Sequence, residues 1–233
     1  MNNKFLSIIF LSIFCINALN AQKKNTPSFK EKTFDLAYAK YKNALKILDY
    51  NTAINATHEI LAVVPEKINF KDSLLALYYT SNKPTNSVLL AKEMVKEGNT
   101  NPTTYEILAT TYQKAGMLKE SLEYYEKIQA INKDLFYEYQ IATIQFNLGR
   151  LQECATSLNS IINNPEAKNA TIKMDYEKET SQNVPFSAAA FNVFGVLSQQ
   201  LKEEEQAKKY FENALKIFPE FILSKNNLEI LNK

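Results

Sequence analysis

A small residue recurs every 34 positions in the first half of this chain. It stands at Ala53, Ser87 and Ser121, and the apolar residues around it follow the three- and four-residue steps of a helix with one buried face. Chance seldom places three helices in the same register. A fixed period of this length indicates an array of similar helical units, each burying its apolar face against its neighbours.

The segment 188–219 shows the structure of one unit most clearly. Its first half carries Phe191, Phe194 and Gly195 on one helix face, where the glycine leaves room for a second helix to approach. Its second half has apolar residues at helical spacing until Pro219, which ends the helix because proline has no amide hydrogen to donate. The polar stretch LKEEEQ lies between the halves, so the unit is predicted to be a hairpin of two antiparallel helices.

This unit resembles the tetratricopeptide repeat, whose pattern is W-x2-L-G-x2-Y…A-x3-F…P. The residues at the matching positions are Phe191, Phe194, Gly195, Ala207, Phe211 and Pro219. Ser198 departs from the expected Tyr. The resemblance implies an all-α solenoid of about five hairpins, with their first helices on a concave side.

The resemblance also divides the chain. Repeats one to five are expected at about 34–67, 68–101, 102–134, 135–165 and 188–221, and a capping helix at 222–233. Repeat three matches strongly, with Tyr105 at the Trp position and Tyr112 at the Tyr position, whereas repeat two rests mainly on spacing. Pro84 is expected to open the second helix of repeat two, where its missing amide hydrogen costs nothing.

An insertion separates repeats four and five. From Cys154 to Ala207 the step is 53 residues, 19 more than the period, which places the insertion at about 166–187. Ile172 and Met174 alternate there with polar residues, and Val184-Pro185-Phe186 could pair back across the polar turn KETSQN. We expect a short β-hairpin or an extended loop, which either adds binding specificity or is a tolerated surface loop.

The N-terminus has the layout of a secretory signal peptide over residues 1–21. Lys4 precedes an apolar run of about fifteen residues, and cleavage is expected after Ala21. A membrane anchor is the alternative, but the run is shorter than a span requires. A lipoprotein at Cys15 is disfavoured by the bulky Phe14. We therefore expect a flexible leader over 22–33, a periplasmic or secreted protein, and no integral membrane segment after cleavage.

The charge balance gives no indication of a nucleic-acid partner. After loss of residues 1–21 the chain carries 26 basic and 25 acidic residues, because Lys4 is the only charge removed. Arg150 is the single arginine, so bidentate contacts to phosphate or guanine are poorly supplied.

Residues for catalysis or metal binding are also scarce. His58 is the only histidine and is expected to be solvated, and four scattered glycines form no phosphate-binding loop. Cys154 occupies a small-residue position, so we interpret it as a buried hydrophobe rather than a reactive thiol. The sequence thus predicts no enzyme, no cofactor and no metal site.

First-helix residues that do not pack inside the array are expected to line the groove. The resemblance implies the positions Tyr38, Lys42, Asp72, Tyr79, Glu106, Gln113, Tyr139, Phe146, Asn192 and Gln199, with Ala76, Thr110, Thr143 and Val196 beside them. The four aromatic residues suggest apolar anchors, unless each packs against a neighbouring helix. The residues do not favour a clamp for a C-terminal carboxylate, since only Lys42 and Asn192 could serve it and three repeats lie between them.

These features predict a non-catalytic interaction scaffold of the bacterial cell envelope. It would hold a partner protein or peptide in the concave groove. The alternative is a structural or assembly factor that self-associates, or that docks on an outer-membrane or secretion complex through its convex face or insertion.

Overall fold

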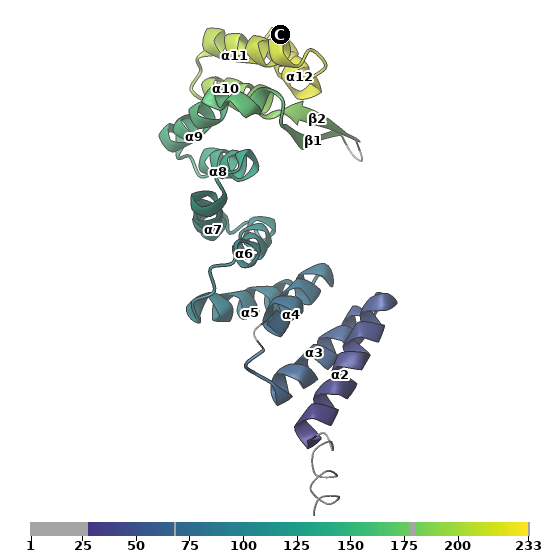
Figure 1. The fold of residues 1–233 in the computed structure, drawn as a ribbon. Coiled ribbons are helices and arrows are strands. Elements are labelled where there is room, and N and C mark those ends of the chain that lie inside the picture. Colours follow the sequence, from purple (N-terminus) through teal and green to yellow (C-terminus); the bar gives the residue numbers. More distant parts are fainter. Residues whose placement is uncertain (1–27, 68, 178–179, 233) are drawn as a thin grey trace, which may run out of the picture. The chain divides into compact units, whose positions relative to one another are not determined.

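The computed structural model describes residues 28–67, 69–177 and 180–232, which are mostly helical (Figure 1). The predicted signal peptide lies outside these residues. The chain divides into two compact parts, an N-terminal part up to Asn86 and a C-terminal part from Ser87. None of the helices in the described ranges combines the length and the apolar character needed to span a bilayer. The predicted all-α class with a small insertion is confirmed.

The N-terminal part contains repeat one and the start of repeat two. Its helices are α2 (Phe29–Lys46), α3 (Tyr50–Val63), α4 (Asn69–Thr80) and the first turn of α5 (Pro84–Lys96). Helix α3 packs against both α2 and α4. Ala37, Ile60, Val64 and Phe70 form the buried core between them. As predicted, Pro84 opens the second helix of repeat two.

Helix α2 begins earlier than the sequence pattern predicted, because residues 29–33 are helical rather than part of a flexible leader. The cause is a capping box. The Ser28 hydroxyl accepts a hydrogen bond from the Glu31 amide at 3.2 Å, and the Glu31 carboxylate accepts one from the Ser28 amide at 2.6 Å. Two amides that would otherwise lack partners are thereby satisfied, which fixes the start of the helix.

The C-terminal part contains repeats three to five and the capping helix. Its elements are α6 (Pro102–Lys114), α7 (Leu118–Asn132), α8 (Leu135–Asn147), α9 (Leu151–Asn163), the 3₁₀ turn η1 (Pro165–Lys168), β1 (Thr171–Glu177), β2 (Thr180–Pro185), α10 (Phe186–Gln200), α11 (Glu204–Ile217) and α12 (Ile222–Leu231). The hairpins α6–α7, α8–α9 and α10–α11 stack in order, since α7 packs on α8 and α9 on α10 (Figure 1). Helix α12 packs on α11, as expected of a cap.

The small residues that set the period are completely buried. They are Ala53, Ser87, Ser121, Cys154 and Ala207, one on the second helix of each repeat. In repeat three the Ser121 hydroxyl donates a hydrogen bond to the backbone carbonyl of Ala109 on the first helix, at 2.8 Å. A larger side chain would separate the two helices, so this contact explains why the position stays small.

Five positions before each of these small residues, the chain has a residue in the left-handed backbone conformation. These turn residues are Leu48, Asn82, Gly116, Gly149 and Lys202, with φ between 52° and 74°. The left-handed residue reverses the chain between the two helices of a repeat. Glycine adopts this conformation without strain, but only two of the five positions hold it.

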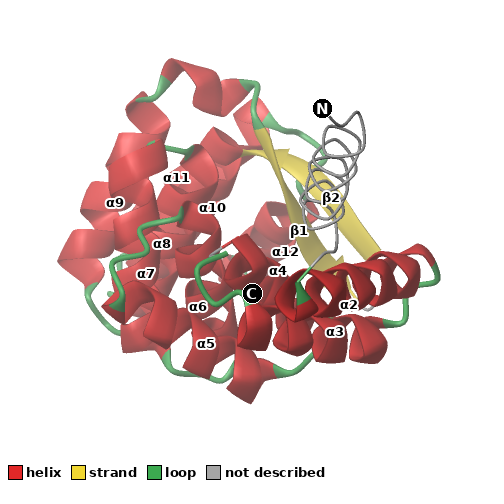
Figure 2. Cartoon of the chain, turned by 60° about the horizontal axis from the view of Figure 1, so that its bottom comes forward, coloured by secondary structure: helices red, strands yellow, loops and turns green. Residues whose placement is uncertain are grey.

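The insertion is a two-stranded antiparallel hairpin, shown as the yellow strands in Figure 2. Ile172 pairs with Val184, and both side chains are buried against the helices. The prediction of a hairpin is confirmed, but its turn is shorter than expected, since residues 180–183 belong to β2. Phe186 begins α10 instead of pairing in the sheet.

The hairpin also holds the start of the capping helix. The Gln182 amide nitrogen donates to the backbone carbonyl of Glu220 at 2.7 Å, and its amide oxygen accepts from the backbone amide of Ile222 at 3.0 Å. Ile222 is the first residue of α12. A side chain of the insertion therefore supplies the cap that the helix N-terminus requires.

Replacing Gln182 by alanine should loosen α12 selectively. Both hydrogen bonds are lost, which costs about 1 to 2 kcal/mol. We expect amide hydrogen exchange in α12 to become about tenfold faster while exchange in α6 and α7 is unchanged. Asn183→Ala, at the exposed neighbouring position, is the matched control. Equal exchange rates in the two variants would contradict the capping role.

Candidate partner-binding surface

The predicted groove residues differ widely in exposure. Tyr38, Lys42, Ala76 and Tyr79 are exposed on α2 and α4. The half-buried residues are Asp72 on α4, Glu106, Thr110 and Gln113 on α6, Thr143 and Phe146 on α8, and Val196 and Gln199 on α10. Tyr139 on α8 and Asn192 on α10 are buried.

The prediction that Tyr139 contacts a partner is wrong, because the β-hairpin covers it. Its ring packs edge-on against Phe186, with ring centres 6.2 Å apart, and its hydroxyl lies 4.0 Å from the sulfur of Met174. The side chain is only 6% exposed and belongs to the core that includes Ile172 and Val184. Burial raises the pKa of the Tyr139 hydroxyl, since ionisation in an apolar environment is costly.

Asn192 is also unavailable to a partner, because α12 covers it. Its amide oxygen accepts hydrogen bonds from the Ser224 hydroxyl at 2.9 Å and from the Asn227 amide at 3.0 Å. The residue is 6% exposed. It joins the capping helix to repeat five instead of facing a groove, so this prediction is wrong as well.

Gln113 connects adjacent repeats. Its amide nitrogen donates to Gln140 on α8 at 3.1 Å, and its oxygen accepts from the Tyr125 hydroxyl on α7 at 3.0 Å. Nearby, burial and the carboxylate of Glu106 raise the pKa of Tyr137. These half-buried groups are already engaged with one another, so they position α6 relative to α8.

The N-terminal part presents a different surface, which combines aromatic rings with lysines. Four rings and two ammonium groups form it: Phe34, Tyr38, Tyr41, Lys42, Lys67 and Phe70. We call this set the aromatic–lysine surface. Tyr38 and Lys42 were predicted from the groove pattern, and the other four were not. Phe34, Tyr38 and Tyr41 follow i, i+4 and i+7 spacing, so the sequence places these three rings on one face of α2.

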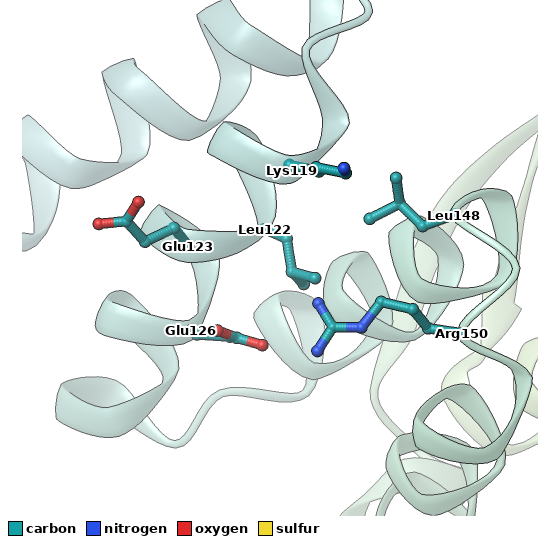
Figure 3. Close-up of a pocket in the computed structure, with 6 residues that line it drawn as sticks. All are labelled: Lys119, Leu122, Glu123, Glu126, Leu148 and Arg150. Carbon is teal, nitrogen blue, oxygen red and sulfur yellow. The ribbon is translucent and has the colours of Figure 1, made fainter.

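A shallow cavity of about 330 Å³ lies between α7 and the α8–α9 turn (Figure 3). Its lining residues are Lys119, Leu122, Glu123, Glu126, Leu148 and Arg150. The Arg150 guanidinium donates to the Glu153 carboxylate, which raises the pKa of Arg150 and lowers that of Glu153. The cavity mixes both signs of charge without converging donors, so it has no evident ligand chemistry. In the ranges that the structure describes, no three His, Cys, Asp or Glu side chains gather as metal ligands.

Cys154 is fully buried, as predicted, and burial raises the pKa of its thiol to about 11. We expect the folded protein without residues 1–21, in which Cys154 is the one cysteine left, to resist a thiol reagent such as 5,5′-dithiobis(2-nitrobenzoic acid) at pH 8, and the unfolded chain to react at once. Because the pKa of the Cys154 thiol is raised in the folded protein, the thiol loses its proton at a lower pH in the unfolded chain than in the folded one. The contribution of Cys154 to the free energy of unfolding is therefore fully present below about pH 9 and declines as the pH rises towards 11.

A Cys154→Ala variant is the control for this pH dependence. Its free energy of unfolding should fall less between pH 9 and pH 11 than that of the parent chain, as measured by urea denaturation at each pH. An identical decline in both chains would show that other groups cause it.

Two segments of the chain match the tetratricopeptide repeat family model, residues 102–135 and 188–221. They coincide with repeats three and five. The structure titled "Crystal structure of YrrB: a TPR protein with an unusual peptide-binding site" is 15% identical, with a TM-score of 0.63, and the match covers 81% of this chain and 88% of that one. The chain has a tetratricopeptide repeat fold.

A second similar structure is titled "Crystal structure of MamA protein". It is 16% identical, with a TM-score of 0.60 over 80% of this chain and 92% of that one. No curated protein sequence matches the chain. The likeness therefore establishes the tetratricopeptide fold, and the partner has to be inferred from the surfaces of this chain.

Proposed function

We propose that this protein is a non-catalytic interaction scaffold that binds a partner protein or peptide through the first helices of its repeats. The aromatic–lysine surface is the observation that carries the proposal. Tyr38 of this surface is 36% exposed on α2, and Tyr79, outside the set, is 38% exposed on the neighbouring first helix α4. Exposed tyrosines give a large contact area at little cost in conformational entropy, which suits a recognition surface.

The comparisons support a binding role over a catalytic one. The matching family is a structural repeat, and the solved relative cited above is described as having a peptide-binding site. His58, the single histidine, donates to or accepts from the Tyr78 hydroxyl at 2.7 Å on the exposed side of α3. It is thus already engaged in a contact between α3 and α4.

The proposed location is the cell envelope, and it rests on the signal peptide pattern of residues 1–21. If the pattern is functional, the mature protein begins at Gln22. N-terminal sequencing of protein recovered from the periplasm or the medium would test this. A product that retains residues 1–21 in the membrane fraction would instead support the anchor.

Site-specific photo-crosslinking would test which surface the partner uses. Ala76 is exposed on the first helix α4, and Ala62 is exposed on the second helix α3, so the two form a matched pair. A photoreactive amino acid at residue 76 should give a discrete crosslinked product in cells, whereas the same group at residue 62 should give none.

The alternative predicts a different pattern in the same experiment. If the protein assembles through its convex face or its insertion, crosslinks should form at residue 62 or at Lys173 on the exposed face of β1. In that case residue 76 would remain silent, and the groove proposal would be abandoned.

A further inference from the structure

Four aromatic rings in the N-terminal part form one continuous group. Along α2, Phe34 stacks on Tyr38 at 5.7 Å between ring centres, and Tyr38 stacks on Tyr41 at 6.2 Å. Phe70 of α4 meets all three edge-on, at 5.9 to 6.2 Å. Phe70 is buried, Phe34 and Tyr41 are half-buried, and Tyr38 is exposed. The row thus has a packed base and one ring open to solvent.

Two lysines cover the edges of this row. The Lys42 ammonium lies 4.7 Å from the centre of the Tyr38 ring, and the Lys67 ammonium lies 4.2 Å from that of Phe34. Neither forms an ion pair with the described residues, whereas Lys30 pairs with Glu66 and Lys40 with Glu59. The aromatic contacts hold the two ammonium groups in place beside the rings and leave their charge available.

The charge around the row is positive. Helix α2 contains five lysines and only two acidic residues, Glu31 and Asp35, which leaves three net positive charges on the helix. Glu31 is engaged in the capping box at the start of the helix, away from Tyr38. Because Lys30 and Lys40 are paired with Glu66 and Glu59, the attraction for a ligand carboxylate comes mainly from Lys42 and Lys67.

We infer that the aromatic–lysine surface binds an acidic peptide segment that carries an aromatic or aliphatic side chain between its acidic residues. The apolar side chain would lie against Tyr38, and the flanking carboxylates would contact Lys42 and Lys67. The inference rests on the proposed function and specifies the chemistry of the partner. Lysines can contact isolated carboxylates without the fixed geometry that arginine needs, so side-chain carboxylates of an extended segment suffice.

Four synthetic peptides would test the inference by fluorescence anisotropy, with the protein lacking only residues 1–21. The probe is a ten-residue peptide that carries Phe and Leu among Asp and Glu residues, with both ends blocked. The second peptide has Lys in place of the acids, the third has Ala in place of Phe and Leu, and the fourth has a free C-terminus. Each of the other three peptides changes one property of the probe.

We expect the blocked acidic peptide with Phe and Leu to bind at least tenfold more tightly than its basic and its alanine versions. The free C-terminus should change the affinity less than twofold. Raising the salt concentration from 50 to 300 mM should weaken binding several-fold, because the contacts to Lys42 and Lys67 are close to solvent.

Matched variants locate the binding site. Tyr38→Ala, or Lys42→Gln combined with Lys67→Gln, should each weaken binding about tenfold. The controls are Phe29→Ala and Lys32→Gln, exposed positions of α2 that take no part in the ring contacts. Circular dichroism should show that all variants keep the helical content of the parent.

The outcomes separate the inference from the proposed function. Equal binding of the acidic and basic peptides, or equal loss in the variants and controls, would overturn the acidic-peptide inference. If none of the peptides binds but the crosslink at residue 76 persists, the scaffold proposal stands and only the inferred partner chemistry fails. A silent residue 76 together with crosslinks at residue 62 or at Lys173 overturns the scaffold proposal and the inference that rests on it.

Discussion

Replacing Tyr139 by alanine is expected to lower the free energy of unfolding by about 3 to 5 kcal/mol, the range for removal of a large buried ring. The ring lies between α8 and the β-hairpin, where it contacts Phe186 and Met174. Its removal leaves a cavity among residues that are themselves buried, so the site cannot collapse freely. Urea denaturation followed by circular dichroism would measure the loss.

The companion variant Tyr139→Phe separates packing from polarity. The hydroxyl faces only the Met174 sulfur at 4.0 Å, a weak acceptor, so its removal should change the stability by less than about 1 kcal/mol. Partner binding should be unaffected by Tyr139→Phe. A stable Tyr139→Ala protein that has lost its partner would instead restore the groove role first predicted for this residue.

Gly195→Ala is expected to destabilise the protein by about 2 kcal/mol, although alanine is the better helix former by about 1 kcal/mol. A methyl group at this position would lie within 3.0 Å of three ring carbons of Phe211 on α11. Phe211 is completely buried, so the ring has no free space into which to move. Thermal or urea denaturation of the single variant gives the sign directly.

The double variant Gly195→Ala with Phe211→Leu is the control for this clash. A smaller side chain at residue 211 should accommodate the methyl group, so the two changes together should cost less than the sum of the single changes. If Gly195→Ala stabilised the protein, helix propensity would outweigh the contact, and the close approach of α10 to α11 would not depend on the glycine.

The repeat architecture could be predicted because its signals are local. The small residues at 53, 87 and 121 and the apolar steps around them reflect packing between two helices adjacent in the sequence. The left-handed turns at Leu48, Asn82 and Lys202 were not predicted, since these residues carry no glycine signal, whereas Gly116 indicated the turn of repeat three. Their strain is offset by the packing of the helices on either side.

The candidate site was predicted less well than the fold. The repeat pattern selects Tyr38, Lys42 and Tyr79, which are exposed in the structure. Their exposure depends only on which face of a helix packs inside its own repeat, and the local pattern reports that face. Tyr139 was misassigned, since the residue that covers it, Met174, lies 35 positions away in an insertion. A periodic pattern does not report a contact between residues so far apart in the sequence. The alternation of apolar and polar residues in 171–185 predicts strands, but it does not predict which helices the strands pack against.

The β-hairpin changes how the end of the array should come apart. In a simple stack each repeat touches only its immediate neighbours, so a terminal element can fray alone. Here the chain between α9 and α10 packs on Tyr139 of repeat four and also caps α12 through Gln182. Opening the C-terminal end therefore requires the hairpin to detach from repeat four, so the last two repeats and their cap should melt as one cooperative block.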